Sequence, residues 1–162
     1  MINNYKGIFF IGDPHIEGTI PGFRKDDYPE VILKKLKWAL NYAEEQQLVP
    51  ICAGDFFNVP RNIPNWLLVK LIGLLDKPLY GIYGNHDCTE NSLSENDALS
   101  ILVSAEKYVL LDQKQLNINI NKNPVVITGT SWGQKIPDFW KKDSNEIVVM
   151  ITHHDFKVPG YM

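Results

Sequence analysis

The chain has 162 residues, of which 44% are hydrophobic and 22% charged, a composition typical of one globular domain that we expect to span residues 1–162. No run approaches the roughly 20 apolar residues of a membrane-spanning helix, which excludes a helical membrane protein. A net charge of −3 excludes an extended basic face. The chain has only two cysteines, both expected to be buried thiols, which excludes a disulfide framework and favours the cytoplasm.

The first half of the chain alternates between strand and helix patterns. The predicted strands cover residues 7–12, 48–54 and 79–84, and the predicted helices cover residues 27–47 and 63–75. Asp27 is a possible cap of the first helix, Pro29 suits its first turn, and Pro64 opens the second helix. Three strands that alternate with helices predict a parallel sheet in an α/β layered fold.

The second half predicts a different arrangement. A helix is expected at 95–106, a strand at 108–111, two strands at 115–120 and 125–130, and a last strand at 146–152. The two strands that flank "NKNP" predict an antiparallel hairpin. There is no internal repeat, low-complexity segment or linker, so all of these elements belong to one compact domain.

Polar residues follow four of the predicted strands. The chain reads "GDPHIE", "GDFFN", "GNHD" and "THHD" at these points, and these segments hold all four of its histidines. In open α/β sheets, ligands bind outside the carboxyl ends of the strands. If the backbone after the first strand is extended, Asp13 and His15 point to the same side and can meet one ion. Carboxylate, amide and imidazole donors together predict a site for Mn²⁺, Fe or Zn²⁺.

The series D-x-H, G-D, G-N-H-D and H resembles the calcineurin-like metallophosphoesterase superfamily, over essentially the whole chain from Asp13 to His153. Within it, "ICAGDFFNVPRNIPNWLLVKLIGLL" is most similar to the Mre11/SbcD branch of DNA nucleases. The resemblance implies an α/β fold with a layered β-sandwich flanked by helices. It also implies a metal-dependent phosphoesterase that hydrolyses phosphodiester bonds.

The resemblance further implies a centre of two divalent metal ions, about 3.5–4 Å apart, that activates a water for attack on phosphorus. Mn²⁺ is the expected metal, with Fe or Zn²⁺ as alternatives. Asp13 and His15 would hold one ion, Asn85 and His153 the other, and Asp55 would bridge both. His153 is preferred over His154 as the ligand, because in this family the first residue after the last strand usually has this role.

His86 is expected to face the substrate, where it stabilises charge or protonates the leaving oxygen. Its neighbour Asp87 is expected to orient the ring and favour its protonated form, and the alternative for Asp87 is a cap of a turn or helix. Arg61 is expected at the surface, although it could also meet a substrate phosphate. Glu17 is expected to be a surface group.

Two positions of the family pattern need comment in this sequence. Asn58 stands three residues after Asp55, where the family carries Asp or Asn in a structural role. The Gly-His-x-His turn that normally completes both metal shells does not occur in the sequence. We therefore expect the domain to be incomplete at its C-terminus, either as a fragment or as a part that a partner chain completes.

Three functions fit these observations. The leading hypothesis is a DNA nuclease, which would work with a partner that opens DNA, such as an ATPase subunit, and which could form a homodimer. The second is a hydrolase of small phosphodiesters or phosphomonoesters. The third is a catalytically inactive scaffold on the same fold, which the absent terminal histidines favour and the intact motif residues oppose.

Overall fold

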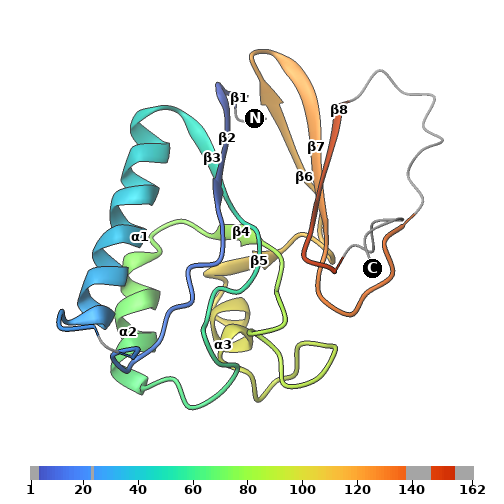
Figure 1. Cartoon of the computed structure of the whole chain (residues 1–162). Coiled ribbons are helices and arrows are strands. Elements are labelled where there is room, and N and C mark those ends of the chain that lie inside the picture. The colour runs from blue at the N-terminus through green and yellow to red at the C-terminus, as the bar shows by residue number, and fades with distance from the viewer. Residues whose placement is uncertain (1–3, 23, 138–146, 156–162) are drawn as a thin grey trace, which may run out of the picture.

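The computed structural model describes residues 4–22, 24–137 and 147–155, and it shows two four-stranded sheets packed face to face (Figure 1). The first sheet has the order β2-β3-β4-β5 and contains Gly7–Ile11, Leu48–Cys52, Leu79–Gly81 and Tyr108–Leu110. The second has the order β1-β6-β7-β8 and contains Asn4–Tyr5, Leu116–Ile120, Asn123–Thr130 and Ile147–Thr152. The predicted layered α/β sandwich is confirmed.

Every strand of the first sheet runs parallel to its neighbours, as the alternating pattern predicts. Helices α1 and α2 cover its outer face, and α3 lies at one end (Figure 1). The helices span Tyr28–Glu45, Asn65–Leu74 and Ala98–Ser104. The carboxylate of Asp27 caps α1 by accepting from the backbone N–H of Glu30, and Pro64 is the N-cap of α2. No described helix is both long and apolar enough to cross a membrane.

The first sheet is buried on both faces, since one core lies on each side of it. Val49 and Ile51 of β3 pack with side chains of β7 and β8 between the two sheets. Cys52, the next residue, packs instead with side chains of α1 and α2. This alternation follows from the period of two along a strand, and it gives β3 its continuous apolar sequence.

The β6–β7 hairpin is antiparallel, as predicted, but its loop is shorter than "NKNP". Asn121 and Lys122 have φ of 49° and 70°, which is the geometry of a two-residue turn between twisted strands. Strand β7 therefore already begins at Asn123 and includes Pro124. Pairing of β7 with β8 starts only at Val125, so the missing N–H of Pro124 costs no hydrogen bond to β8.

All four strands that end in the motifs were expected in the centre of the sheet, and the last strand, β8, differs from this prediction. It lies at the edge of the second sheet, parallel to β7, and not beside the strands that carry the other three motifs. Residue 146, where the strand was expected to begin, lies outside the described residues. Because the two sheets pack together, the carboxyl end of β8 still reaches the end of the first sheet where β2, β3 and β4 finish (Figure 1).

Candidate metal centre

The loops after β2 and β3 run side by side and hold the first two motifs together. The backbone N–H of His15 donates to the carbonyl of Asp55 at 3.0 Å, and that of Ile16 donates to Phe56 at 2.9 Å. Asp13 and His15 have φ of 43° and 44°, so the backbone here is not extended and the argument for their common orientation was wrong. Positive φ costs about 1–3 kcal/mol at a non-glycine residue, and such strain clusters at functional sites.

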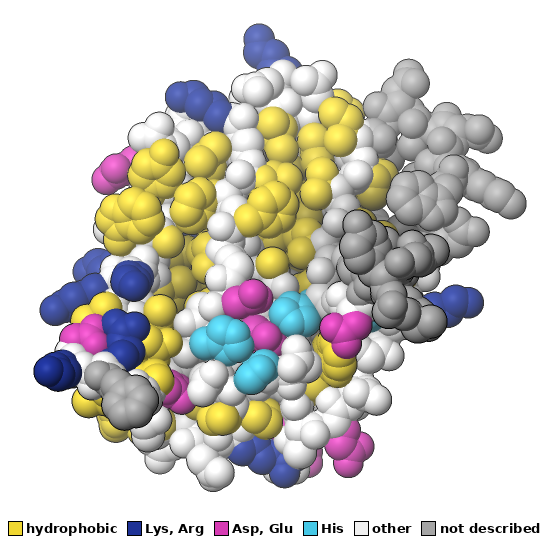
Figure 2. Space-filling model, in the orientation of Figure 1, with side chains coloured by type: hydrophobic (Ala, Val, Ile, Leu, Met, Phe, Trp, Pro, Cys, Tyr) yellow, Lys and Arg dark blue, Asp and Glu magenta, His cyan; other side chains and the backbone are white. Residues whose placement is uncertain are grey.

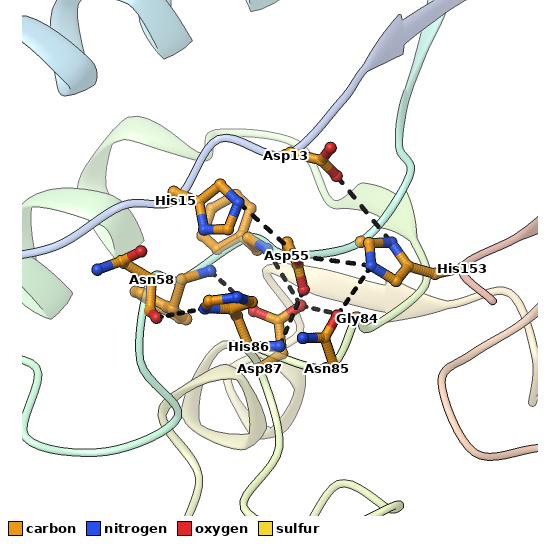
Figure 3. A network of polar contacts seen from close by, with 12 residues as sticks. Asp13, His15, Asp55, Asn58, Gly84, Asn85, His86, Asp87 and His153 are labelled. Carbon is orange, nitrogen blue, oxygen red and sulfur yellow. Dashed lines mark hydrogen bonds and ion pairs between the residues drawn. The ribbon is translucent and has the colours of Figure 1, made fainter. Parts of the chain in front are cut away.

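Asp55 lies at the centre of the motif residues (Figure 3). Its Oδ2 is 3.7 Å from Nε2 of His15 and 3.4 Å from Nε2 of His153. Its Oδ1 accepts a hydrogen bond of 2.9 Å from the backbone N–H of His86. The residue is only 5% exposed, and its φ of 48° is again in the left-handed region. The carboxylate of the G-D motif therefore contacts groups from each of the other three motifs.

The glycines that precede Asp55 and Asn85 make room for this packing. Gly54 has a φ of 103°, and a Cβ on it would lie 2.6 Å from Nδ1 of His153. A Cβ on Gly84 would lie 2.6 Å from the backbone nitrogen of Asp55 and still closer to its Oδ1. The glycines in G-D and G-N-H-D are therefore required by close approach between chain segments, and not only by a turn.

His153 approaches Asp55 from the second sheet with one ring nitrogen held by the backbone. Its Nδ1 is 3.0 Å from the carbonyl of Ala53, which can only accept, so we assign the ring proton to Nδ1. In the neutral ring, Nε2 then presents a lone pair to Oδ1 of Asn85 at 3.2 Å and to Oδ2 of Asp55 at 3.4 Å. Three lone-pair donors that face one another repel unless a cation lies between them. The donor set therefore fits a metal ion.

His86 is anchored by a residue that the sequence did not indicate as its partner. Its Nδ1 lies 2.8 Å from the carbonyl oxygen of Asn58, and its ring meets that of His15 edge to face, with the centroids 4.7 Å apart. The carbonyl again requires Nδ1 to carry the proton, so Nε2 is the atom left for other chemistry. Since the contact uses a backbone oxygen, no side-chain pattern could have predicted it.

Asp87 does not orient the ring of His86, and this part of the prediction was wrong. Its carboxylate is fully buried and accepts from the backbone N–H groups of Phe56, Phe57 and Gly84 at 2.8–3.0 Å. Burial raises its pKa to about 6, although these three hydrogen bonds act in the opposite direction. Asp87 therefore ties the loop after β4 to the loop after β3, close to the capping role considered as its alternative.

Two sets of side chains could each hold a metal ion, and both include Asp55. One set is His15, Asp55 and His86, and the other is Asp13, Asp55 and His153, with the ligand atoms of each set within 4.8 Å of one another. The shared carboxylate agrees with the expected bridging role of Asp55. The pairing differs from the expected one, because Asp13 and His15 fall into different sets. Asn85 lies beside the second set through its contact with His153.

Other residues of the motifs have structural partners. Glu17 is only 9% exposed and accepts a 2.6 Å hydrogen bond from the side chain of Asn58, so its expected surface position was wrong. His154 stacks on Trp132, which also lies edge to face against His153, so His154 is part of neither set. Sequence reasoning missed Trp132, whose only signal was its place just after a strand.

Arg61 binds a carboxylate within the chain, although almost half of its side chain is exposed. Its Nε is 3.1 Å from Oδ1 of Asp97, a fully buried residue that the sequence analysis did not single out. Burial acts to raise the pKa of Asp97, but hydrogen bonds from Thr89, Ser94 and Arg61 outweigh it and the pKa lies below its usual value. This ion pair joins the segment after β3 to the segment before α3.

A family model described as calcineurin-like phosphoesterase matches residues 7–161. The chain belongs to the calcineurin-like phosphoesterase family. No curated protein matches its sequence. Membership confirms the superfamily that the four motifs predicted, and with it the coarser function of a metal-dependent phosphoesterase. The match is to the family as a whole.

The residues of this phosphoesterase fit the divalent ions that its family implies. Besides the converging lone pairs at His153, Nδ1 of His15 is buried with no hydrogen-bond partner among the described residues, and its Nε2 is too far from Asp55 for a hydrogen bond. The rings of His15 and His153 therefore each have a nitrogen that is free to bind a metal. The cluster is open to solvent, since the side chain of Asp13 is 59% exposed and histidine and acidic side chains gather at the surface (Figure 2).

The choice between the two adjacent histidines leads to a testable prediction. We expect His153→Ala to lose about one bound Mn²⁺ per chain and His154→Ala to lose none, because His153, and not its neighbour His154, presents a nitrogen to Asp55. Elemental analysis after dialysis against Mn²⁺ measures the difference, and thermal unfolding of both variants controls for loss of fold. Equal metal contents in the two variants would contradict the assignment.

Proposed function

We propose that this phosphoesterase cleaves phosphodiester bonds of DNA with two Mn²⁺ ions bound around Asp55. The observation that carries the proposal is that one buried carboxylate is shared by two donor sets on an exposed part of the surface (Figure 2). A polymer needs such an open site, because the chain continues on both sides of the bond that is cut. The similarity of the segment after Asp55 to the DNA-nuclease branch gives further support.

The metal ions, when bound, would polarise the phosphoryl oxygen and lower the pKa of the attacking water. Backbone carbonyls of the chain orient the histidine rings, and His86 transfers the proton. The carbonyl of Asn58 holds Nδ1–H of His86, so a protonated ring has Nε2–H free to donate to the leaving oxygen. The edge-to-face contact with His15 limits rotation of that ring. The carbonyl of Ala53 holds His153 in the same way, with Nε2 toward Asp55.

Mn²⁺ is proposed because carboxylate and amide oxygens accompany the imidazoles in the donor sets.

We also propose that the protein is cytoplasmic, where free thiols persist, since Cys52 and Cys88 are both unpaired and buried. Burial raises the pKa of these thiols to about 12 and about 11, so neither offers a reactive thiolate. A partner that opens the duplex, such as an ATPase subunit, completes the proposal.

One observation favours a second candidate, a hydrolase of small phosphoesters. Arg61, which was expected at the surface but could also have met a substrate phosphate, is held by Asp97. A polyanionic strand loses one contact by this pairing, whereas a small ester held between metal ions does not need it. The relative rates with DNA and with a small diester therefore distinguish the two functions.

The deciding experiment measures Mn²⁺-dependent hydrolysis of bis-p-nitrophenyl phosphate and of a labelled DNA duplex. We expect both to be cleaved, and we expect His86→Ala to lower kcat by about 10²–10⁴-fold because a positioned proton donor is lost. His86 also lies within reach of the ion near His15 and Asp55, but the proposal keeps its Nε2 for the leaving oxygen and leaves His15 and Asp55 to hold that ion. Metal content of His86→Ala should therefore stay at the wild-type value, with His154→Ala as the matched histidine control. Cleavage of the small diester alone would support the second candidate. No cleavage of either substrate would contradict both, and loss of metal in His86→Ala would make it a ligand.

A further inference from the structure

The outer face of α1 carries two large aromatic side chains that belong to neither hydrophobic core. Trp38 is 63% exposed and Tyr42 is 39% exposed. Their rings stack on each other, with centroids 5.6 Å apart and planes inclined by 23°. Phe9 of β2 also packs against Tyr42, with the ring centroids 5.6 Å apart. The two stacked rings thus form one continuous exposed aromatic surface, and contiguous exposed apolar surface is a feature of interaction sites.

Lysines border this surface. Lys34 and Lys37 line a surface hollow of about 310 Å³ together with Trp38 and Tyr42, and Asn41 and Glu45 complete its wall. Neither lysine forms a salt bridge with a described residue. Over α1, hydrophobic side chains and Lys or Arg side chains appear together on the same face as the histidine cluster (Figure 2). The hollow therefore offers aromatic faces and positive charge to the same ligand.

We propose that Trp38 and Tyr42 form a stacking platform for unpaired bases of single-stranded nucleic acid, with Lys34 and Lys37 on its phosphates. Successive bases stack on exposed aromatic rings whatever the sequence, and lysines follow the backbone charge. A protein partner fits less well, because lysine is depleted from protein–protein interfaces. Glu45 opposes a polyanion at one side of the hollow, so the strand is expected to pass over the Lys34 and Lys37 side.

The platform is connected to the metal centre through α1 itself. Tyr28, in the first turn of this helix, donates from its hydroxyl to the carbonyl of His15 at 2.9 Å. Trp38 lies ten residues further, which is about 15 Å along a helix. A stacked strand covers that length with about four to five nucleotides. The inference rests on the proposed function, in that the platform would hold the single-stranded part of the DNA whose end is cleaved.

Binding is measured without cleavage, by fluorescence anisotropy of a labelled oligothymidylate of about 16 nucleotides in EDTA. We expect Trp38→Ala to weaken binding by about 5- to 100-fold, and Trp38→Phe, which keeps an aromatic face, to weaken it only a few-fold. Val69→Ala is the matched control, since Val69 is an apolar residue of α2 that is 68% exposed. Lys34→Ala and Lys37→Ala should each reduce the slope of log K against log salt by about 0.7.

The outcomes separate this proposal from the proposed function. Unchanged hydrolysis of bis-p-nitrophenyl phosphate by Trp38→Ala, together with weaker oligonucleotide binding, supports both. Trp38-dependent binding by a protein that cleaves no phosphodiester supports the platform alone. Equal binding by wild type and Trp38→Ala, or no binding by wild type, overturns the platform. A dimer that is lost in Trp38→Ala while oligonucleotide binding is unchanged also overturns it, and would identify a contact between protein chains.

Discussion

Asp55→Asn is expected to lower kcat/KM for a phosphodiester by about 10³-fold or more and to remove most of the bound metal. Asp55 is the only residue common to both donor sets of the described residues, so its loss weakens both ions at once. The Lewis-acid stabilisation that depends on them amounts to several kcal/mol, and each 1.4 kcal/mol is about a tenfold change in rate. Asn also tolerates the φ of 48° at this position, so the backbone is expected to stay in place.

The measurement combines elemental analysis with kinetics on bis-p-nitrophenyl phosphate. Asp76→Asn is the control, because Asp76 is an exposed carboxylate that neither donor set contains. A variant Asp55→Asn that keeps two bound ions and activity within tenfold of wild type would show that the two sets do not depend on a shared carboxylate.

Gly84→Ala is expected to destabilise the fold by about 2–3 kcal/mol and to reduce metal binding. The added Cβ would lie 2.6 Å from the backbone nitrogen of Asp55, and a backbone atom in a packed loop moves only with its neighbours. The Gly84 N–H also donates to the buried Asp87 carboxylate at 2.9 Å, so a shift of this loop disturbs that hydrogen bond as well. Urea unfolding gives the change in free energy, and Mn²⁺ titration gives the change in affinity.

Gly73→Ala is the matched control for this substitution. Gly73 lies in the last turn of α2, and a Cβ on it would meet nothing within 4 Å. Alanine at this helical position is therefore expected to stabilise the protein by up to about 0.5–1 kcal/mol. If the two variants have the same stability, close approach is not what requires a glycine in the G-N-H-D motif.

Patterns that act within a few residues could be predicted from the sequence. Asp27 and Pro29 marked the start of α1, and apolar runs located β2, β3 and β4. The position of β8 could not be predicted, because an apolar strand reads the same in either sheet. The aromatic pair at 38 and 42 has helical spacing, but only the packed helix decides that both rings remain outside the core.

The sequence by itself determined the fold class and the family chemistry. It also determined which residues come together, because strand-end positions bring the motifs to one end of the sheets; these residues are Asp13, His15, Asp55, Asn85 and His153. Only the tertiary structure decided how they pair and what holds them. Asp87 accepts from N–H groups about 30 residues away, and His86 is held by the backbone carbonyl of Asn58. Such contacts involve backbone atoms that every residue carries, so no side-chain pattern announces them, and folding alone brings them within hydrogen-bond distance.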